Sequence, residues 1–337
     1  MEIKTAVILL NLGGPQNLKQ VKPFLFSLFY DKTILNMPKP IRWIVAKLIS
    51  SLRNKKAKNI YSLMGGKSPI IDETNKQAIA LQKELDKEKY KVFICMRHSE
   101  PNIDELQKQI KNYKPDQIIG IPLYPQFSYT TTHSAIEQIK EKFKDIKLKF
   151  IGCFYTCPKY IKTQVDLIKE AIKNNNVELN KAILLFSAHS LPIRIIEEGD
   201  PYQSQIQKTV DLITQQLPKQ LEYKITYQSK VGPIKWLEPK TEDEIEKACK
   251  QEKEIVIVPI SFVSEHSETL VELDIEYAEI AQKSNTKYVR VKTVGTEKDF
   301  ISCLKDLVES CTNNEHQITS QQKTRLCDEK FKYCSCR

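Results

Sequence analysis

The chain has 337 residues, of which 41% are hydrophobic and 28% charged, and its formal net charge is +10. This length predicts two domains with buried cores, and the composition excludes a disordered or fibrous protein. No apolar run approaches the roughly 20 residues of a membrane-spanning helix. Most of the positive charge comes from lysine, whereas base-specific DNA binding favours arginine, so we expect no nucleic-acid partner.

The N-terminal residues lead directly into an apolar segment at 6–10, which leaves no room for a secretion signal or an arginine-rich transit peptide. We therefore expect a cytoplasmic location. The nine cysteines fit no even framework, and most are scattered among apolar elements. That distribution is typical of reduced thiols in a reducing compartment.

Short apolar runs alternate with longer segments of helical periodicity along most of the chain. The runs predict strands at 5–10, 91–95, 117–121, 148–152, 182–187, 223–228 and 254–260. The segments between them predict helices at 73–87, 102–112, 134–144, 159–174, 202–216 and 241–251. This alternation favours an α/β fold with parallel sheets covered by helices.

A second cycle of strands and helices opens near residue 182, so we expect two similar α/β halves. We place the N-terminal half at 1–165 and the C-terminal half at 166–310. A C-terminal tail at 311–337 is expected to follow.

The stretch 37–56 combines an apolar stripe with basic neighbours. On a helix the stripe consists of Ile41, Ile44, Val45, Leu48 and Leu52. Two interpretations stay open, an ordinary packed helix and an interfacial helix that lies on anionic lipid.

Two histidines, His189 and His266, follow predicted strands of the second half. Ligands bind beyond the carboxyl ends of strands in open parallel sheets. Imidazole accepts protons near neutral pH, so His189 beside a carboxylate such as Glu268 would make a base. A hydrogen-bonded structural histidine is the alternative.

The segment 264–281 contains six acidic residues and no lysine or arginine. If it is helical, Glu268, Glu272 and Glu276 line one face, where like charges cost about 0.2–0.5 kcal/mol per pair. The segment is either a solvated acidic face or a carboxylate ladder that carries protons or a divalent cation.

The C-terminal region holds Cys327, Cys334 and Cys336. Three thiols at this spacing match no strong zinc or iron–sulfur pattern. Exposed thiols in a loose tail are the favoured interpretation.

Several motifs occur together in one order and resemble those of ferrochelatases, lyases that insert ferrous iron into porphyrin. The most specific is the run FSAHSLP at 186–192, followed by EGDPY at 198–202. The others lie at 10–15, 65–69, 122–126, 227–233 with 236–237, and 262–270 with 272–277.

The resemblance implies two Rossmann-like halves that hold porphyrin in the cleft between them. It also implies that His189 accepts pyrrole protons and that Glu268 is its essential partner, with both residues contacting the metal. An acidic path would continue through Glu272 and Glu276, with His266 beside it. The porphyrin-binding positions are Trp236, Arg97, Leu12 and Ser190.

The function implied is insertion of Fe²⁺ into protoporphyrin IX to give protohaem, the last step of haem biosynthesis. The alternatives are a related tetrapyrrole chelatase for another metal and a non-enzymatic porphyrin or haem carrier. The stretch 37–56 matches the lip that family members press against a membrane, here the cytoplasmic face of the inner membrane. The resemblance leaves the oligomeric state open.

Some positions depart from the family pattern. Arg97 precedes His98 instead of an aromatic residue, and Glu265 stands where aspartate is usual. Members with a [2Fe-2S] cluster take one ligand from a segment where this chain has Tyr129, and their tail cysteines are spaced differently, so we expect no cluster. Leu12 replaces a tyrosine of the coproporphyrin-using branch, which favours protoporphyrin IX.

Overall fold

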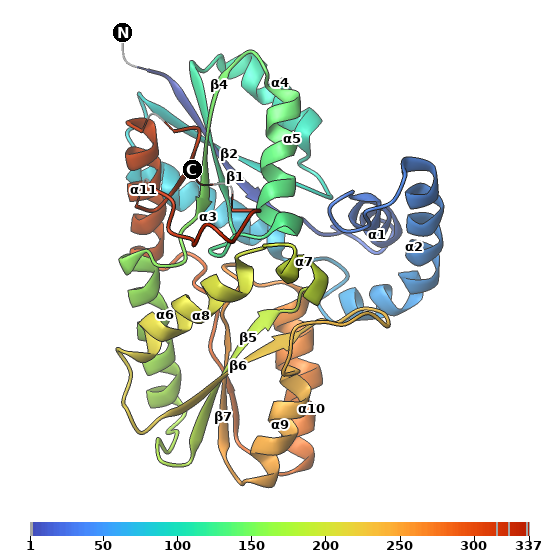
Figure 1. The fold of residues 1–337 in the computed structure, drawn as a ribbon, viewed down its shortest axis with the longest axis vertical. Coiled ribbons are helices and arrows are strands. Elements are labelled where there is room, and N and C mark those ends of the chain that lie inside the picture. The colour runs from blue at the N-terminus through green and yellow to red at the C-terminus, as the bar shows by residue number, and fades with distance from the viewer. Residues whose placement is uncertain (1–2, 315, 323, 335, 337) are drawn as a thin grey trace.

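The computed structural model describes residues 3–314, 316–322, 324–334 and 336. They form two parallel sheets, each covered on both faces by helices (Figure 1). The first sheet has the strand order β2-β1-β3-β4-β9 and the second has the order β6-β5-β7-β8. The predicted α/β fold with two halves is therefore confirmed.

In the first sheet, alternate residues of β1 pack against different helices. Its strands are β1 (Thr5–Asn11), β2 (Tyr90–Met96), β3 (Gln117–Pro122), β4 (Lys147–Cys153) and β9 (Ile318–Ser320). Val7 and Leu9 face α3 (Ile70–Glu84) and α11 (Lys298–Thr312). Ala6, Ile8 and Leu10 face α4 (Ile103–Tyr113) and α5 (Ser134–Lys142). Burial on both faces explains why β1 is a continuous apolar run.

The second sheet is built in the same way. Its strands are β5 (Ala182–His189), β6 (Glu222–Gln228), β7 (Glu254–Pro259) and β8 (Tyr288–Arg290). One face packs on α6 (Pro158–Asn174) and α8 (Tyr202–Thr214). The other packs on α9 (Thr241–Lys250), on the π-helix η2 (Glu268–Tyr277) and on α10 (Ala278–Lys283). The short helix α7 (Ile193–Glu197) follows β5 near the seam between the halves (Figure 1).

All the predicted strands and helices form, with boundaries that differ by a few residues. The sequence pattern missed β8 and β9, each of which has three residues, too few to show a period. It also missed the single π-helical turn η1 (Tyr129–His133) ahead of α5 and the helices at 21–30, 193–197 and 298–312.

The chain crosses between the halves within helices. In the described residues α6 leads from β4 to β5, and α11 leads from β8 back to β9. The boundaries expected at 165 and 310 thus fall inside α6 and α11. The region expected as a tail contributes β9, because the open edge of β4 offers backbone groups that a parallel strand can pair with.

Helices α1 (Val21–Tyr30) and α2 (Lys39–Ser62) project from the body beside the seam (Figure 1). Proline at the start of α2 fits a position whose N–H has no intrahelical partner. Several large apolar side chains of α2 are more than half exposed, namely Ile41, Ile44, Leu48 and Leu52. Among the described residues no helix is long and apolar enough to cross a membrane.

Candidate active site

The segments that follow three strands of the second sheet bring the predicted residues His189 and Glu268 together with Ser229. His189 is the last residue of β5, Ser229 directly follows β6, and Glu268 begins η2 beyond β7. Because β5 lies between β6 and β7, these side chains meet at one point of the carboxyl edge. That edge faces the first half of the molecule (Figure 1).

His189 and Glu268 form a direct hydrogen bond of 2.7 Å between Nδ1 and Oε2. The imidazole is 38% exposed and the carboxylate 23%, so a substrate at the seam can reach both. The backbone of His189 is fixed on both sides, since its N–H donates to Ser261 Oγ and its carbonyl accepts from the Tyr202 hydroxyl. The second ring nitrogen, Nε2, is thus held in one orientation.

The pair shifts the protonation of both partners. Burial lowers the pKa of His189, but the Glu268 carboxylate outweighs burial and the net shift is upward. Burial raises the pKa of Glu268, yet His189 and the hydrogen bond between them bring it well below its usual range. The site therefore favours an ionised carboxylate beside an imidazole of increased basicity.

Ser229 links this pair to the next carboxylate. Its hydroxyl lies within hydrogen-bond distance of Glu268 Oε2, at 3.1 Å, and of Glu272 Oε2. Its backbone N–H donates to Glu272 Oε1 from a left-handed conformation with φ of +64°. Burial and the charge of Glu268 raise the pKa of Glu272. The Ser229 hydroxyl carries one hydrogen and can donate to only one of the two carboxylates. If it donates to Glu268, a proton on Glu272 can be donated to Ser229 Oγ, and both contacts are then hydrogen bonds.

The rest of the acidic segment is only partly joined to this site. Glu272 also accepts from the Gln228 side-chain amide and from the Tyr277 hydroxyl, each within 3.0 Å. Glu276 is exposed, farther along η2. His266 is buried, and its Nδ1 lies 3.0 Å from the Ser264 carbonyl oxygen.

Glu265, which departs from the family pattern, faces away from this network. Its carboxylate accepts from Arg290 Nη1 at 2.7 Å and from the Thr293 N–H at 3.0 Å. Arg290 also binds Asp274 through two nitrogens. These contacts connect the loop before η2 to β8.

Two of the expected porphyrin-binding residues lie beside His189. Ser190 is fully buried, and its hydroxyl donates to the Leu237 carbonyl at 3.3 Å. Trp236 pairs with Pro192 through a backbone bridge, and its buried Nε1 has no hydrogen-bond partner among the described residues. Ser190 therefore positions the segment that carries Trp236.

The other two, Arg97 and Leu12, belong to the first half. Arg97 Nη2 binds Asp31 at 2.7 Å, and its Nε donates to Ser134 Oγ at 2.8 Å. These three residues line a hollow of about 420 Å³ beside α5. Leu12 packs against Ile70, Ile71 and Met96.

His98 is buried beside Arg97, and its Nδ1 lies 3.1 Å from Ser27 Oγ. Burial, together with the Arg97 charge, lowers the pKa of His98 to about 3, so the imidazole is neutral. A neutral, hydrogen-bonded ring can therefore stand where an aromatic residue is usual.

The ferrochelatase family model matches residues 4–312. The chain belongs to the ferrochelatase family. It is 51% identical to a ferrochelatase of Rickettsia felis, over 100% of this chain and 99% of that protein. It is 48% identical to a ferrochelatase of a Wolbachia strain from Drosophila simulans, over 90% of this chain and 98% of that protein.

Solved chelatase structures share the fold. SirB from Bacillus subtilis with Fe³⁺ superposes with a TM-score of 0.54 at 12% identity, covering 93% of this chain and 97% of that one. The sirohydrochlorin chelatase SirB from Bacillus subtilis subspecies spizizenii, in complex with cobalt, gives 0.53 at 11% identity, with the same coverage.

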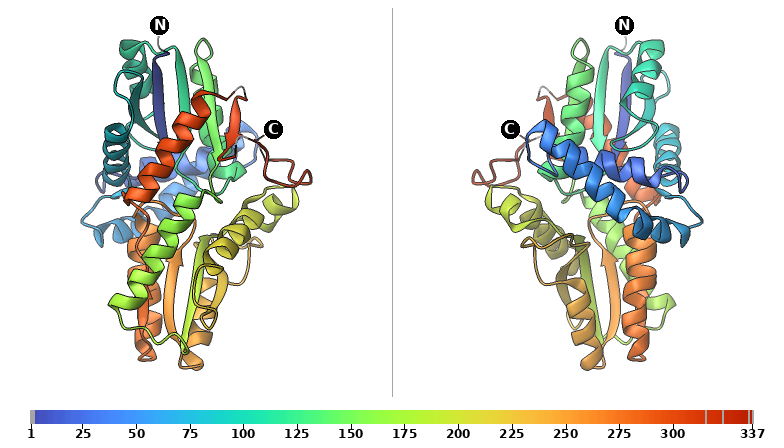
Figure 2. Two further views of the ribbon diagram at one scale, coloured as in Figure 1. Left: turned by 90° about the vertical axis from the view of Figure 1, so that its left-hand side faces the viewer. Right: turned by 90° about the vertical axis from the view of Figure 1, so that its right-hand side faces the viewer.

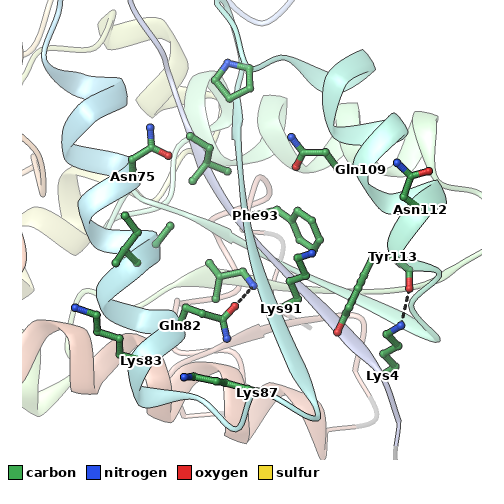
Figure 3. A pocket seen from close by; sticks show the side chains of 15 residues that line it. Lys4, Asn75, Gln82, Lys83, Lys87, Lys91, Phe93, Gln109, Asn112 and Tyr113 are labelled. Carbon is green, nitrogen blue, oxygen red and sulfur yellow. Dashed lines mark hydrogen bonds between the residues drawn. The ribbon is translucent and has the colours of Figure 1, made fainter.

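A larger hollow, of about 820 Å³, lies at the outer edge of the first sheet (Figure 3). Its lining includes Lys4, Lys83, Lys87 and Lys91 from around β2. There Gln82 occupies the free edge of β2, accepting from the Val92 N–H and donating to the Tyr90 carbonyl. This hollow contains none of the residues that the ferrochelatase motifs point to.

Four thiols gather where the C-terminal region meets the two halves. Thiol hydrogen bonds connect Cys327 with Cys334, Cys334 with Cys336, and Cys336 with Cys153 at the end of β4. Cys327 also accepts from Gln205 of α8 at 3.1 Å. In the described part of the chain, no three His, Cys, Asp or Glu side chains are arranged around one metal ion. The contacts instead run pairwise from thiol to thiol.

Two of these arrangements escaped sequence reasoning. Ser229 lies just beyond the predicted strand 223–228, much as His189 lies beyond 182–187. It could therefore have been predicted from the rule that ligand sites follow the ends of strands. Cys153 could not be found by spacing, because 174 positions separate it from Cys327; only the pairing of β9 with β4 brings the two regions together.

Glu268→Gln should lower the pKa of His189, because the carboxylate that opposes burial is removed. Titration of the imidazole resonances by NMR measures this shift. Glu276→Gln is the matched control, since Glu276 is exposed and should leave His189 unchanged. An unaltered His189 pKa in Glu268→Gln would contradict the coupling.

Proposed function

We propose that the chain inserts Fe²⁺ into protoporphyrin IX to give protohaem, with His189 and Glu268 as the catalytic and metal-contacting pair. The observation that carries this proposal is their 2.7 Å hydrogen bond at the carboxyl edge facing the seam. Leu12 at the turn after β1 supports protoporphyrin over coproporphyrin as substrate.

Metal insertion requires two pyrrole N–H protons to leave while a divalent ion arrives. His189, whose pKa is raised, is the group suited to accept them. The acceptor is the neutral imidazole, so metallation should slow as the pH falls through the His189 pKa. Glu268 stabilises the imidazolium once it has formed.

Protons then need a route away from the macrocycle. Glu268, Ser229 and Glu272 form a continuous series of hydrogen-bonding groups leading into η2. Glu276 extends the series toward solvent, and His266 lies close enough to Glu268 for its charge to lower the Glu268 pKa. We assign this series to proton or metal transit.

The porphyrin is proposed to bind at the seam between the halves. Trp236 offers an aromatic face and an indole N–H that lacks a protein partner. Arg97 offers a guanidinium suited to a propionate, and Leu12 an apolar contact from the first half. Binding energy spent on bending the macrocycle would expose the nitrogen lone pairs.

Anaerobic mixing of the protein with protoporphyrin IX and Fe²⁺ tests this function, with loss of porphyrin fluorescence and growth of the haem bands as readouts. Wild type should turn over, and His189→Ala and Glu268→Gln should each lose at least about 10²-fold in rate. His316→Ala, an exposed histidine, is the control. If either site variant kept most of the wild-type rate, the catalytic role assigned to that residue would be wrong.

The same assay separates the alternatives. Tight porphyrin binding without turnover indicates a carrier. Turnover only with Co²⁺ or Ni²⁺, or only with coproporphyrin, indicates a different chelatase.

We infer that the protein acts at the cytoplasmic face of the membrane, with α2 lying on anionic lipid. The apolar residues Ile44 and Leu52 of α2 are 61% and 73% exposed. Lys47, Lys55 and Lys56 supply positive charge nearby. An apolar face beside basic residues is the pattern of interfacial helices.

Ile44→Ser with Leu52→Ser should weaken sedimentation with phosphatidylcholine–phosphatidylglycerol vesicles by about tenfold or more, since each buried apolar side chain is worth about 1.5–3 kcal/mol. Ile79→Ser, 59% exposed on α3, is the matched control. If the double variant and wild type sedimented equally, α2 would be an ordinary surface helix that does not bind lipid.

The four gathered thiols bear on the cluster that some family members carry. The spacing of the cysteines, together with Tyr129 at the position of one family ligand, predicted that this chain has no [2Fe-2S] cluster. The contacts of Cys153 support a different ligand set, and we propose that Cys153, Cys327, Cys334 and Cys336 hold a [2Fe-2S] cluster. Each iron of such a cluster takes two thiolates, so pairwise thiol contacts fit it better than a single metal ion. Bound there, the cluster would supply iron–thiolate bonds that tie the C-terminal region to β4.

Anaerobically purified protein should then contain stoichiometric iron and acid-labile sulfide, with visible absorption arising from thiolate-to-iron charge transfer. Cys153→Ser should lose this absorption, whereas Cys249→Ser, a cysteine of α9, should retain it. Colourless wild type without iron would support the original expectation.

A further inference from the structure

The two helices that carry the chain between the halves meet on one flank of the molecule, where α11 lies along the first half and α6 along the second (Figures 1 and 2). Cys157 is the residue that precedes α6, and Cys303 lies in the second turn of α11. The helices are also joined by Lys159, which donates to Ser302 Oγ at 2.7 Å and pairs with Asp306. These contacts hold the two cysteines in a fixed relation.

The sulfur atoms of this pair are in direct contact. Cys303 Sγ donates to Cys157 Sγ at a distance of 2.7 Å, and both cysteines are reduced. A disulfide has a sulfur–sulfur distance of about 2.05 Å. Bond formation therefore requires a movement of less than about 1 Å.

The start of α6 stabilises a thiolate at Cys157. The hydrogen bond from Cys303 is the largest influence that lowers the Cys157 pKa, burial opposes it, and the backbone N–H groups of Tyr160 and Lys159 add to it. Cys157 stands at the N-cap position of α6, next to the positive end of the helix dipole, which also favours a negative charge. Such a thiolate is the nucleophilic form of cysteine.

Burial limits what can reach the pair. Cys157 is 6% exposed and Cys303 is fully buried. Hydrogen peroxide is small, so we expect it to reach the Cys157 sulfur, whereas a bulky thiol reagent should be excluded from the folded protein. Redox-sensing cysteines combine a low-pKa thiolate with a neighbouring resolving thiol, and this pair has both features although it is less exposed than most sensors.

We propose that Cys157 and Cys303 form a dithiol site that a hydroperoxide oxidises to a disulfide. The Cys157 thiolate attacks the peroxide and becomes a sulfenic acid, while the peroxide is reduced and leaves as the first water. The Cys303 thiol then attacks the sulfenic sulfur and expels the second water. Two thiols lose two electrons and two protons, and one peroxide becomes two waters.

The disulfide would close residues 157–303 into a covalent ring that contains the whole second sheet. Its two ends would be joined at the point where the chain enters and leaves that half, so the relative orientation of the halves would be fixed. The site is independent of His189 and Glu268, which lie in a different part of the fold.

The experiment treats wild type with hydrogen peroxide without added Fe²⁺ and maps disulfides by mass spectrometry of non-reduced peptides. A Cys157–Cys303 peptide should appear before oxidation of other buried cysteines such as Cys249, and a bulky maleimide should leave the pair unlabelled in native protein. The midpoint of thermal unfolding should rise on oxidation and return on reduction.

Cys157→Ser is the matched variant, because serine caps a helix as well and keeps the fold. In this variant Cys303 should stay reduced and the thermal shift should vanish, while Cys249→Ser should behave as wild type. Three results on wild type would overturn the proposal: Cys157 stopping at sulfenic or sulfinic acid, either cysteine pairing elsewhere, or both staying reduced while Cys327 oxidises.

Discussion

Glu268 keeps a negative charge in a site that is largely shielded from water, and its hydrogen bond to His189 is the interaction that permits this. Isolated, either group would shift toward its neutral form, because burial penalises charge. Each partner instead opposes this effect in the other, because the carboxylate raises the pKa of His189 and the imidazole lowers the pKa of Glu268. Ser229 lies between Glu268, whose pKa is lowered, and Glu272, whose pKa is raised, so the two neighbouring carboxylates differ in their affinity for a proton.

The π-helical turn of η2 matters to this arrangement. A π-helix has wider turns than an α-helix and occurs frequently at functional sites. The carboxylates of Glu268 and Glu272 both reach Ser229 from η2, whereas Glu276 is already exposed. Within the acidic segment, Glu268 and Glu272 are thus held by residues at the strand ends, whereas Glu276 is exposed to solvent.

Much of the fold could be predicted from period alone, because the strands of both sheets are buried on two faces and appear as apolar runs. His189 and Glu268 could be predicted because the motifs at 186–192 and 262–270, each beyond a predicted strand, contain them. The return of the chain through α11 to β9, the meeting of Cys153 with Cys336, and the contact of Cys157 with Cys303 could not. All three depend on pairing between distant segments, and β9 is too short to show a pattern.

The chain topology makes the second half an insertion within the first. During synthesis the strands β1 to β4 emerge together, yet β9, which completes their sheet, emerges only after the whole second half. Until then the open edge of β4 and the apolar face that receives α11 lack their partners. Such late, long-range pairing is slow and leaves exposed surface on which chains can associate. The nascent chain thus depends on α11 and β9, which are made late, to complete a sheet whose first strand is β1.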